Sequence, residues 1–530
     1  MPKKRFYITT PIYYPSARLH IGHAYCTVLT DVFARSKRMR GYECYFLTGA
    51  DEHGQKIEKN ALAAGKTPQE FVDGIVEGFY KLWDLLKISN NDFIRTTQER
   101  HTKVVQDIFT HMYKNGDIYL GEYEGWYCTQ CESFWTNTQA GTEHLCPDCG
   151  RPVQIAKEEA YFFKTSKYLD SLLKFYEDNP KFLVPESRKN EMINTFIKPG
   201  LDDLCVSRTS FSWGIPIKEN PRHVIYVWLD ALTNYITALG YDSGDSTLFN
   251  KFWQDEDSEI IHILGADITR FHAIYWPMFL ESLGLRKPDR EFIHGLLMMK
   301  DDKMSKSKGN VVDPFPLVER YGVDAVRYYL AREVTFGQDG SFTPEQFVER
   351  INMDLANAYG NLLNRTVSMI NKYFDGIIPI YQGLKTPFDG DLETLTTFTI
   401  NQYEKLMDDL KITEATVLIN ELVNRANKYI DETAPWVLAK DEAKKEELAS
   451  VMNHLANAIF VIANLYRPIL VDSYEKAMDQ LGVKEIDRNY QQITNKHVLD
   501  NCVVNKGNPL FPRLDSQIEI AFIQDLMKNN

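Results

Sequence analysis

The sequence of 530 residues lacks any run of 18 consecutive apolar residues, so no membrane-spanning helix is predicted. Met1-Pro2-Lys3-Lys4-Arg5 is basic, but no apolar segment follows it, which argues against a secretory leader and favours the cytoplasm. Internal repeats and low-complexity tracts are also absent. Hydrophobic residues make up 44% and charged residues 25%, which excludes a disordered or collagen-like chain. We expect three or four globular domains, at roughly 150 residues per domain.

Cysteine is scarce, with 8 in 530 residues, which excludes a disulfide-stabilised scaffold. Four of them form two pairs, Cys128-x2-Cys131 and Cys146-x2-Cys149. Four thiolates at this spacing suit tetrahedral Zn²⁺, and a complete set leaves no open position, so we predict one structural zinc ion. Four unligated buried thiols are the alternative. The remaining cysteines are interpreted as core residues: Cys26, Cys44, Cys205 and Cys502.

Positive charge is in deficit, because 60 Lys and Arg face 73 Asp and Glu, giving a formal net charge of −13. Net charge alone would argue against a polyanionic partner. Basic residues nevertheless cluster in two places: Arg35, Lys37, Arg38 and Arg40, and Lys300, Lys303, Lys306 and Lys308. Because local patches decide binding, polyanions stay possible ligands.

Strand and helix patterns alternate over the first 120 residues, with strands expected at 6–9 and 42–47 and an amphipathic helix between them. Apolar strands are predicted again at 224–229, 260–264 and 292–297. This alternation favours a Rossmann-like α/β domain with a parallel sheet, split by an insertion that carries the four cysteines. From about 345 onward only helical periodicity remains, which indicates a helical bundle. The expected domains are 1–117, 118–222, 223–297, 298–347 and 348–530.

A first candidate site is His20-Ile21-Gly22-His23, which follows a strand and opens the amphipathic helix. Helix N-termini present free N–H groups and partial positive charge, which suits a phosphate. Gly22 would let a flat purine approach the backbone, and two imidazoles could stabilise charge that develops on the phosphate. Two polar residues that merely cap a helix are the alternative.

A second candidate site is Lys303-Met304-Ser305-Lys306-Ser307-Lys308-Gly309, which follows the last predicted strand. Lysines with small polar residues make a cationic phosphate clamp, whereas a solvated loop is the alternative. Together the two sites could hold the α-phosphate and the leaving pyrophosphate of a nucleotide, as adenylyl transfer requires.

The pair of motifs resembles the signatures of class I aminoacyl-tRNA synthetases. Further motifs resemble the methionyl-tRNA synthetases in particular: Pro11-Ile12-Tyr13-Tyr14-Pro15, Gly49-Ala50-Asp51-Glu52-His53-Gly54, Tyr226-Val227-Trp228-Leu229-Asp230-Ala231 and Phe271-His272-Ala273-Ile274-Tyr275-Trp276-Pro277. The resemblance covers nearly the whole chain, in order.

The resemblance implies a ligase that activates L-methionine with ATP and transfers it to methionine tRNA, including the initiator tRNA, with Mg²⁺ accompanying ATP. It implies that His20, His23, Lys303 and Lys306 are catalytic, and that they bind ATP together with Gly22, Gly265 and Asp267. Asp51 is expected to bind the methionine ammonium group. The expected lining of the apolar slot is Ile12, Tyr14, Trp228, Ala231, Tyr235, Ile268, Phe271 and His272, several of which core packing would also explain.

An aromatic ring, a guanidinium and an amide can stack on and read an unstacked RNA base. The resemblance implies this role for Asn361, Arg365 and Trp436, because they match family positions that read the anticodon. Otherwise Trp436 would be interpreted as a core residue of the bundle. Because the chain ends soon after the bundle, a monomer is predicted.

Three alternatives are disfavoured. Isoleucine, leucine and valine enzymes carry a large editing insertion, whereas only about 280 residues separate the two signatures here. A cysteine enzyme would need an open zinc position, which a four-cysteine set does not leave. A non-catalytic zinc-ribbon tRNA-binding protein is the other alternative, and the intact histidines and lysines argue against it.

Overall fold

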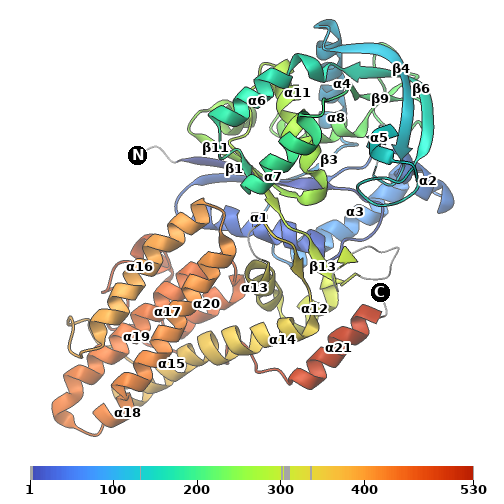
Figure 1. The fold of residues 1–530 in the computed structure, drawn as a ribbon. Helices are drawn as coiled ribbons and strands as arrows, with labels where there is room; N and C mark the ends of the chain where they lie inside the picture. The colour runs from blue at the N-terminus through green and yellow to red at the C-terminus, as the bar shows by residue number, and fades with distance from the viewer. Residues whose placement is uncertain are drawn as a thin grey trace. The chain divides into compact units, whose positions relative to one another are not determined.

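The computed structural model describes residues 4–131, 133–135, 137–299, 302–303, 311–334 and 337–528. The chain divides into two compact units, and each is described by itself. The first unit consists of 1–19, 42–83 and 89–294, and the second of 20–41, 84–88 and 295–530. Figure 1 shows the sheets and helices of both, coloured from blue at the N-terminus to red at the C-terminus.

The first unit is built on a six-stranded parallel sheet of order β3-β2-β1-β11-β12-β7. The strands are β1 (Arg5–Tyr13), β2 (Glu43–Ala50), β3 (Asp92–Arg95), β7 (Leu183–Val184), β11 (Ser258–Gly265) and β12 (Arg290–His294). The central strand β1 is buried almost throughout, as expected for a parallel sheet covered on both faces. The sheet order reverses at β1 and β11, and the carboxyl ends of strands at such a reversal are where open parallel sheets bind ligands.

Between β3 and β11 the chain forms a second, antiparallel sheet of order β5-β4-β6-β8. Its strands are β4 (Ile118–Cys128), β5 (Ser133–Trp135), β6 (Gln154–Phe163) and β8 (Leu204–Cys205). Two short strands, β9 (Ser207–Arg208) and β10 (Val224–Ile225), pair antiparallel next to it in sequence. Within the expected insertion 118–222, β7 returns to the parallel sheet by pairing with β12.

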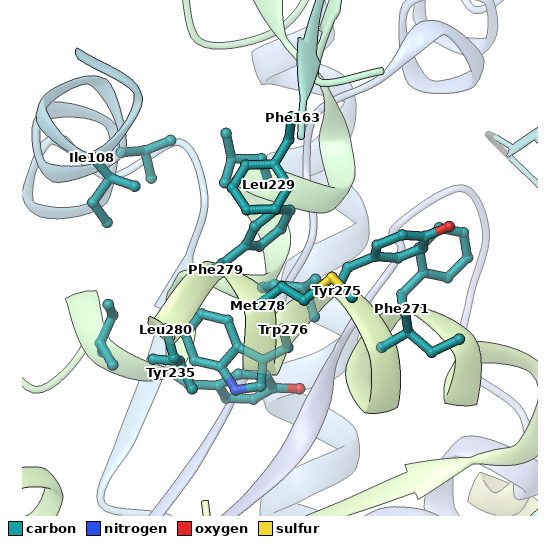
Figure 2. Packing of buried hydrophobic residues seen from close by; sticks show 14 of the residues in the cluster. Ile108, Phe163, Leu229, Tyr235, Phe271, Tyr275, Trp276, Met278, Phe279 and Leu280 are labelled. Atoms are coloured by element: carbon teal, nitrogen blue, oxygen red, sulfur yellow. The ribbon is translucent and has the colours of Figure 1, made fainter. Parts of the chain in front are cut away.

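Helices complete the first unit. They are α2 (Gln55–Ala63), α3 (Pro68–Leu85), α4 (Glu99–Lys114), α5 (Asn137–Ala140), α6 (Leu169–Asp178), α7 (Glu186–Glu191), α8 (Val227–Leu232), α9 (Asn234–Thr237), α10 (Thr247–Phe249) and α11 (Trp276–Ser282). A π-helical turn, η5 (Phe271–Tyr275), precedes α11. The core between these elements is rich in aromatic residues, and Figure 2 shows part of it, with Phe163 and Phe279 labelled. These two rings meet edge to face with centroids 4.9 Å apart. Such pairs stabilise a core beyond their buried area.

One sequence prediction is wrong for 224–229. The extended segment ends at Ile225, pairs antiparallel with β9 rather than joining the parallel sheet, and gives way to α8 at Val227. A short apolar run does not distinguish a strand from a buried helix. The predicted strand 292–297 is also shorter, since β12 ends at His294. Gly295 follows, where a Cβ atom would lie 1.7 Å from the Gln338 carbonyl oxygen.

The second unit begins with α1 (Ile21–Met39) and continues with a small sheet of β13 (Leu297–Met299), β14 (Asp302–Lys303) and β15 (Gly340–Ser341). The helices α12 (Pro314–Tyr321) and α13 (Val323–Glu333) follow β14. Arg327 of α13 is fully buried, pairs with Asp31 of α1 at 2.7 Å, and donates to the carbonyl groups of Leu86, Pro468 and Ile469. Because these donors reach three segments of the unit, Arg327 ties α1 to Leu86 and to the stretch 468–469.

The remainder of the second unit is helical. Its elements are α14 (Pro344–Arg350), the π-helical η7 (Ile351–Gly360), α15 (Asn361–Phe374), α16 (Asp389–Asp408), α17 (Ile412–Thr433), α18 (Pro435–Leu438), α19 (Lys445–Tyr466), α20 (Val471–Gln480) and α21 (Ser516–Lys528). The helices α15, α16, α17 and α19 pack together as a bundle, and α18 lies at one end of it (Figure 1). The α/β class, the four-cysteine insertion and the helical bundle are therefore confirmed.

One helical stretch, Glu442–Tyr466, is long and apolar enough to cross a membrane by length and composition. Within the structure, 89% of its most apolar window is buried. A core helix of a bundle passes the same test, and this burial places Glu442–Tyr466 in that class.

Candidate active site

Several predicted site residues lie at the carboxyl ends of the strands where the sheet order reverses. Ile12 and Tyr14 lie at the carboxyl end of β1, and Asp51 directly follows β2. The Asp51 N–H donates to the Tyr13 carbonyl oxygen at 3.0 Å, which keeps Asp51 beside the end of β1. Ile268 follows β11, the other neighbour of β1. These residues come from three adjacent strands, and ligands of open parallel sheets bind at such a position.

An aromatic wall lies in the same unit. The rings of Trp228 and Phe271 stack with centroids 3.5 Å apart and an interplanar angle of 3°. Trp228 is half-buried and comes from α8, whereas Phe271 is buried and comes from η5 (Phe271 is labelled in Figure 2). Ala231 lies one turn after Trp228 on α8 and is 6% exposed. Flat aromatic surface with little polarity suits a thioether side chain.

Tyr235 and His272 form a buried polar pair beside this wall. The Tyr235 hydroxyl and His272 Nε2 are 2.8 Å apart, and His272 Nδ1 lies 3.1 Å from the Ile268 carbonyl oxygen. Because a carbonyl oxygen only accepts, Nδ1 carries the proton and Nε2 accepts from the tyrosine. Burial lowers the pKa of His272 to about 4, so the imidazole is neutral at neutral pH.

His262 of β11 packs against Tyr235 and was not predicted from the sequence as a site residue. Its ring stacks on Tyr235 with centroids 4.1 Å apart, and its Nε2 accepts from the Trp276 indole at 3.3 Å. Its Nδ1 therefore donates to the Thr9 hydroxyl at 2.8 Å. Burial lowers the pKa of His262 well below its ordinary value. A histidine in an apolar strand was the only signal in the sequence.

Asp230 is a second functional candidate that the sequence did not reveal. It lies within the motif Tyr226-Val227-Trp228-Leu229-Asp230-Ala231, directly after the predicted strand 224–229, and the sequence assigned its side chain no role. In the structure it is fully buried and contacts both His53 and His101.

Gly265 and Asp267 lie at the carboxyl end of β11. A Cβ atom at Gly265 would lie 2.8 Å from Asp267 Oδ1, so a larger residue there would displace this carboxylate. Asp267 is exposed and lies inside the short helical turn η4 (Ala266–Ile268), whose N-cap is Gly265. An exposed acceptor at this place fits a ribose hydroxyl.

The histidine motif lies in the second unit at the start of α1. His20 is the N-cap, and its Nδ1 accepts from the Gly22 N–H at 3.1 Å. His23 Nδ1 accepts from the His20 N–H at 3.2 Å, and the two rings are 4.0 Å apart. With both Nδ1 atoms accepting, each neutral ring carries its proton on Nε2. A Cβ atom at Gly22 would lie 2.9 Å from the His20 ring, so this arrangement requires glycine.

The lysine motif is only partly within the described residues. Lys303 ends β14, whose backbone pairs with Met298 of β13. Lys306 lies outside the described residues, as do Lys300 and Lys308. Val312, shortly after the motif, accepts from the Ile21 N–H at 3.0 Å, so the chain that follows the lysines is attached to the first turn of α1.

The four predicted metal ligands meet in the first unit. The sulfur atoms of Cys128, Cys131, Cys146 and Cys149 all lie within 4.8 Å of one another, with Cys128 and Cys149 at 3.7 Å and Cys131 and Cys146 at 4.0 Å. A tetrahedron with zinc–sulfur bonds of about 2.3 Å has sulfur–sulfur distances of about 3.8 Å. The donor set therefore fits one four-coordinate ion.

The predicted anticodon residues lie near one end of the bundle. Arg365 of α15 pairs with Asp431 of α17 at 3.1 Å, and α17 ends two residues later at Thr433. Trp436 follows on α18 and is 44% exposed, so it is not a core residue of the bundle. Asn361 is also exposed, one turn before Arg365 on α15.

Comparison with known proteins identifies the family. The family described as "tRNA synthetases class I (M)" matches residues 6–156 and 149–367, and the anticodon binding domain of methionyl tRNA ligase matches 382–510. The methionine–tRNA ligases of Oceanobacillus iheyensis and Bacillus subtilis are 56% and 54% identical to this chain. The alignments cover 99% and 100% of the chain and 79% and 81% of those proteins.

A solved structure agrees. Mycobacterium tuberculosis methionyl-tRNA synthetase in complex with methionyl-adenylate superposes with a TM-score of 0.92 at 40% identity, covering 96% of this chain and all of that one. The chain therefore belongs to the methionyl-tRNA synthetase family of class I tRNA synthetases.

Proposed function

We propose that this chain activates L-methionine with ATP and transfers it to methionine tRNAs, including the initiator. In the first step the methionine carboxylate attacks the α-phosphate, and pyrophosphate leaves. In the second step a terminal ribose hydroxyl of the tRNA attacks the activated carbonyl, and AMP leaves. The observation that carries the proposal is the neutral aromatic slot at the sheet reversal, in a chain of this family.

The slot binds methionine by shape and polarizability. Trp228 and Phe271 offer stacked aromatic surface to the thioether, and Ile12, Ala231 and Ile268 complete its apolar lining. Tyr14, Tyr235 and His272 limit its extent, and the neutral state of His272 avoids placing a cation beside the sulfur. Asp51 accepts from the methionine ammonium group, because a carboxylate at these strand ends is the natural counter-ion.

Charge on the phosphates is stabilised by the two signatures. His20 and His23 carry their protons on Nε2 and act as donors to the phosphate oxygens, and Gly22 keeps the helix start open. Lys303 and Lys306 neutralise the leaving pyrophosphate, and Mg²⁺ bound to ATP supplies further charge neutralisation. Gly265 and Asp267 bind the ribose of ATP, and the Asp267 carboxylate accepts a hydrogen bond from a ribose hydroxyl. No side chain is a covalent nucleophile.

Zinc held by Cys128, Cys131, Cys146 and Cys149 supplies a structural cross-link. A complete four-thiolate set leaves no position for substrate, so the metal takes no part in either step.

The tRNA anticodon is recognised at the end of the bundle where α18 lies (Figure 1). Trp436 stacks on an anticodon base, while Asn361 and Arg365 offer donors to base edges and phosphate.

The proposed functional division is 1–117, 118–222, 223–297, 298–347 and 348–530, with Leu183–Val184 returning to the parallel sheet. A monomer in the cytoplasm stays a prediction.

The test is charging of a methionine tRNA transcript by the purified chain, with labelled methionine, leucine, isoleucine and valine in parallel. We expect label from methionine alone to enter acid-precipitable tRNA. Charging with another amino acid in preference would contradict the specificity, and tRNA binding without any charging would favour a non-catalytic tRNA-binding protein.

A further inference from the structure

A buried polar cluster lies behind the methionine slot, and none of its members touches the substrate in the scheme above. Asp230 of α8 is fully buried. Its Oδ2 lies 2.6 Å from His53 Nδ1, and its Oδ1 lies 2.7 Å from His101 Nε2. The opposite nitrogen of His101, Nδ1, is 2.7 Å from the Thr237 hydroxyl. Both carboxylate oxygens accept, so both histidines donate to Asp230.

The cluster joins the segments that carry the slot. His53 lies two residues after Asp51, and Thr237 lies two residues after Tyr235. Asp230 itself lies between Trp228 and Ala231 on α8. His101 belongs to α4, whose apolar face packs into the core of the first unit through Val104, Val105 and Ile108. The cluster therefore connects the Asp51 loop, α8 and α9 to one fixed helix.

The Asp51 loop is held by this connection and by several further anchors. The Asp51 N–H donates to the Tyr13 carbonyl oxygen, and the buried Glu52 carboxylate accepts from Arg95 and Thr97.

The His53 ring meets Trp213 edge to face at 5.4 Å, and the Gly54 N–H donates to the Trp213 carbonyl oxygen at 3.1 Å. Gly54 has φ +119°, a conformation that disfavours other residues. Among these anchors, His53 is the residue that connects the loop through Asp230 to α8 and to His101 of α4.

The charge of Asp230 is consistent with such a role. Burial alone would raise the pKa of this carboxyl, but His53 and His101 bring it below its ordinary value. A buried carboxylate with two donors is costly to break, because removal of one donor leaves a charged oxygen without a partner. The geometry of the slot is therefore coupled to an intact cluster.

We propose that Asp230, through His53 and His101, is a positioning residue that holds the Asp51 loop and the Trp228-bearing helix α8 in one arrangement and thereby tunes the affinity for methionine. The inference rests on the proposed function. Asp230 acts on the ammonium-binding loop and the aromatic wall and not on the histidine or lysine signatures, so the effect should concentrate on methionine and spare ATP.

The test uses a matched pair at one position, His53→Asn and His53→Gln. The asparagine amide nitrogen takes the place of Nδ1 and can still donate to Asp230, whereas the longer glutamine places its nitrogen beyond that point. Methionine-dependent pyrophosphate–ATP exchange is measured at varied methionine and at varied ATP, with the thermal midpoint of each variant. His111→Gln, at an exposed position on the same helix as His101, is the control.

We expect His53→Gln to raise the KM for methionine by about 10-fold, because the buried Asp230 carboxylate loses one of its hydrogen-bond donors. The KM for ATP and kcat should stay within about twofold, and His53→Asn and His111→Gln should match the wild type. An unchanged KM for methionine in His53→Gln would overturn the inference. So would a KM for methionine and a KM for ATP that change equally, or His53→Asn and His53→Gln behaving alike. Absence of exchange in the wild type would instead refute the proposed function.

Discussion

The cysteine knuckle, residues 128–153, and the methionine slot belong to the same unit but are held together by different forces. Among the knuckle residues whose side chains the structure describes, the buried core consists of five, two of them cysteines: Cys128, Trp135, Ala140, Cys146 and Val153. The slot rests on a continuous cluster that extends from Tyr7 to Ile293. A core as small as that of the knuckle buries too little apolar surface to fold alone, so a metal must replace it, whereas the slot is stabilised by its packing.

The largest expected effect comes from removing the metal. Cys146→Ser, or a strong chelator, should remove the zinc and unfold the knuckle, because structural zinc contributes about 10–16 kcal/mol in small domains. Metal analysis and limited proteolysis measure this, with cleavage expected inside 128–153 and the parallel-sheet core intact. Cys205→Ser, a buried cysteine outside the cluster, should keep its metal. Full metal content in Cys146→Ser would contradict a four-cysteine site.

Acid should weaken the slot through its buried histidines. Burial lowers the pKa of His272 to about 4 and that of His262 well below its ordinary value. An unfolded histidine titrates near 6.5, so between pH 6.5 and 4 the unfolded chain takes up protons that the folded chain refuses. The free energy of unfolding should therefore fall as the pH falls through this range, by about 3 kcal/mol for His272.

Urea unfolding at pH 7, 5.5 and 4.5, followed by near-ultraviolet circular dichroism, measures this loss. His272→Asn keeps a donor for the Ile268 carbonyl oxygen but does not titrate, so its unfolding free energy should depend less on pH. Identical pH dependence in the variant and the wild type would show that His272 does not titrate as described.

Asp51 provides a test of the slot without loss of packing. Asp51→Asn keeps the shape of the side chain and removes its charge, so the KM for methionine should rise roughly 10- to 100-fold, the range for a hydrogen bond between charged groups. Exchange kinetics at varied methionine measure it, and the exposed Asp257→Asn is the control. A methionine KM that does not change would remove Asp51 from the site.

The smallest effect on stability is expected at Trp436. Because its ring is 44% exposed, Trp436→Ala should leave the thermal midpoint unchanged. Loss of one stacked base should lower tRNA charging by about 10-fold or more, while exchange stays normal. The neighbouring Val437→Ala, also exposed, should affect neither. An equal fall of charging and exchange would indicate a packing role for Trp436.

The same contrast explains what could be predicted from the sequence. The knuckle ligands are local, and the spacing of Cys128, Cys131, Cys146 and Cys149 alone predicted that the sulfur atoms meet. The helix 21–39 was equally legible, because its apolar positions repeat at helical spacing. The slot is assembled from segments far apart in the chain, so its residues could be proposed only through the family resemblance.

Residues that support the site by holding other side chains could not be predicted from the sequence. His262 stacks beneath Tyr235, and Asp230 contacts two histidines from other elements, so neither leaves a pattern along the sequence. The run 224–229 was misassigned because its apolar character is shared by strands and buried helices, and in the structure α8 begins at Val227.

The most direct test of the central claim is pyrophosphate–ATP exchange by the purified wild-type protein with each amino acid supplied separately. The proposed mechanism predicts that labelled pyrophosphate enters ATP when methionine is present, and that leucine, isoleucine, valine and cysteine have little effect. Exchange that does not depend on methionine, or that another of these amino acids stimulates more strongly, would contradict it.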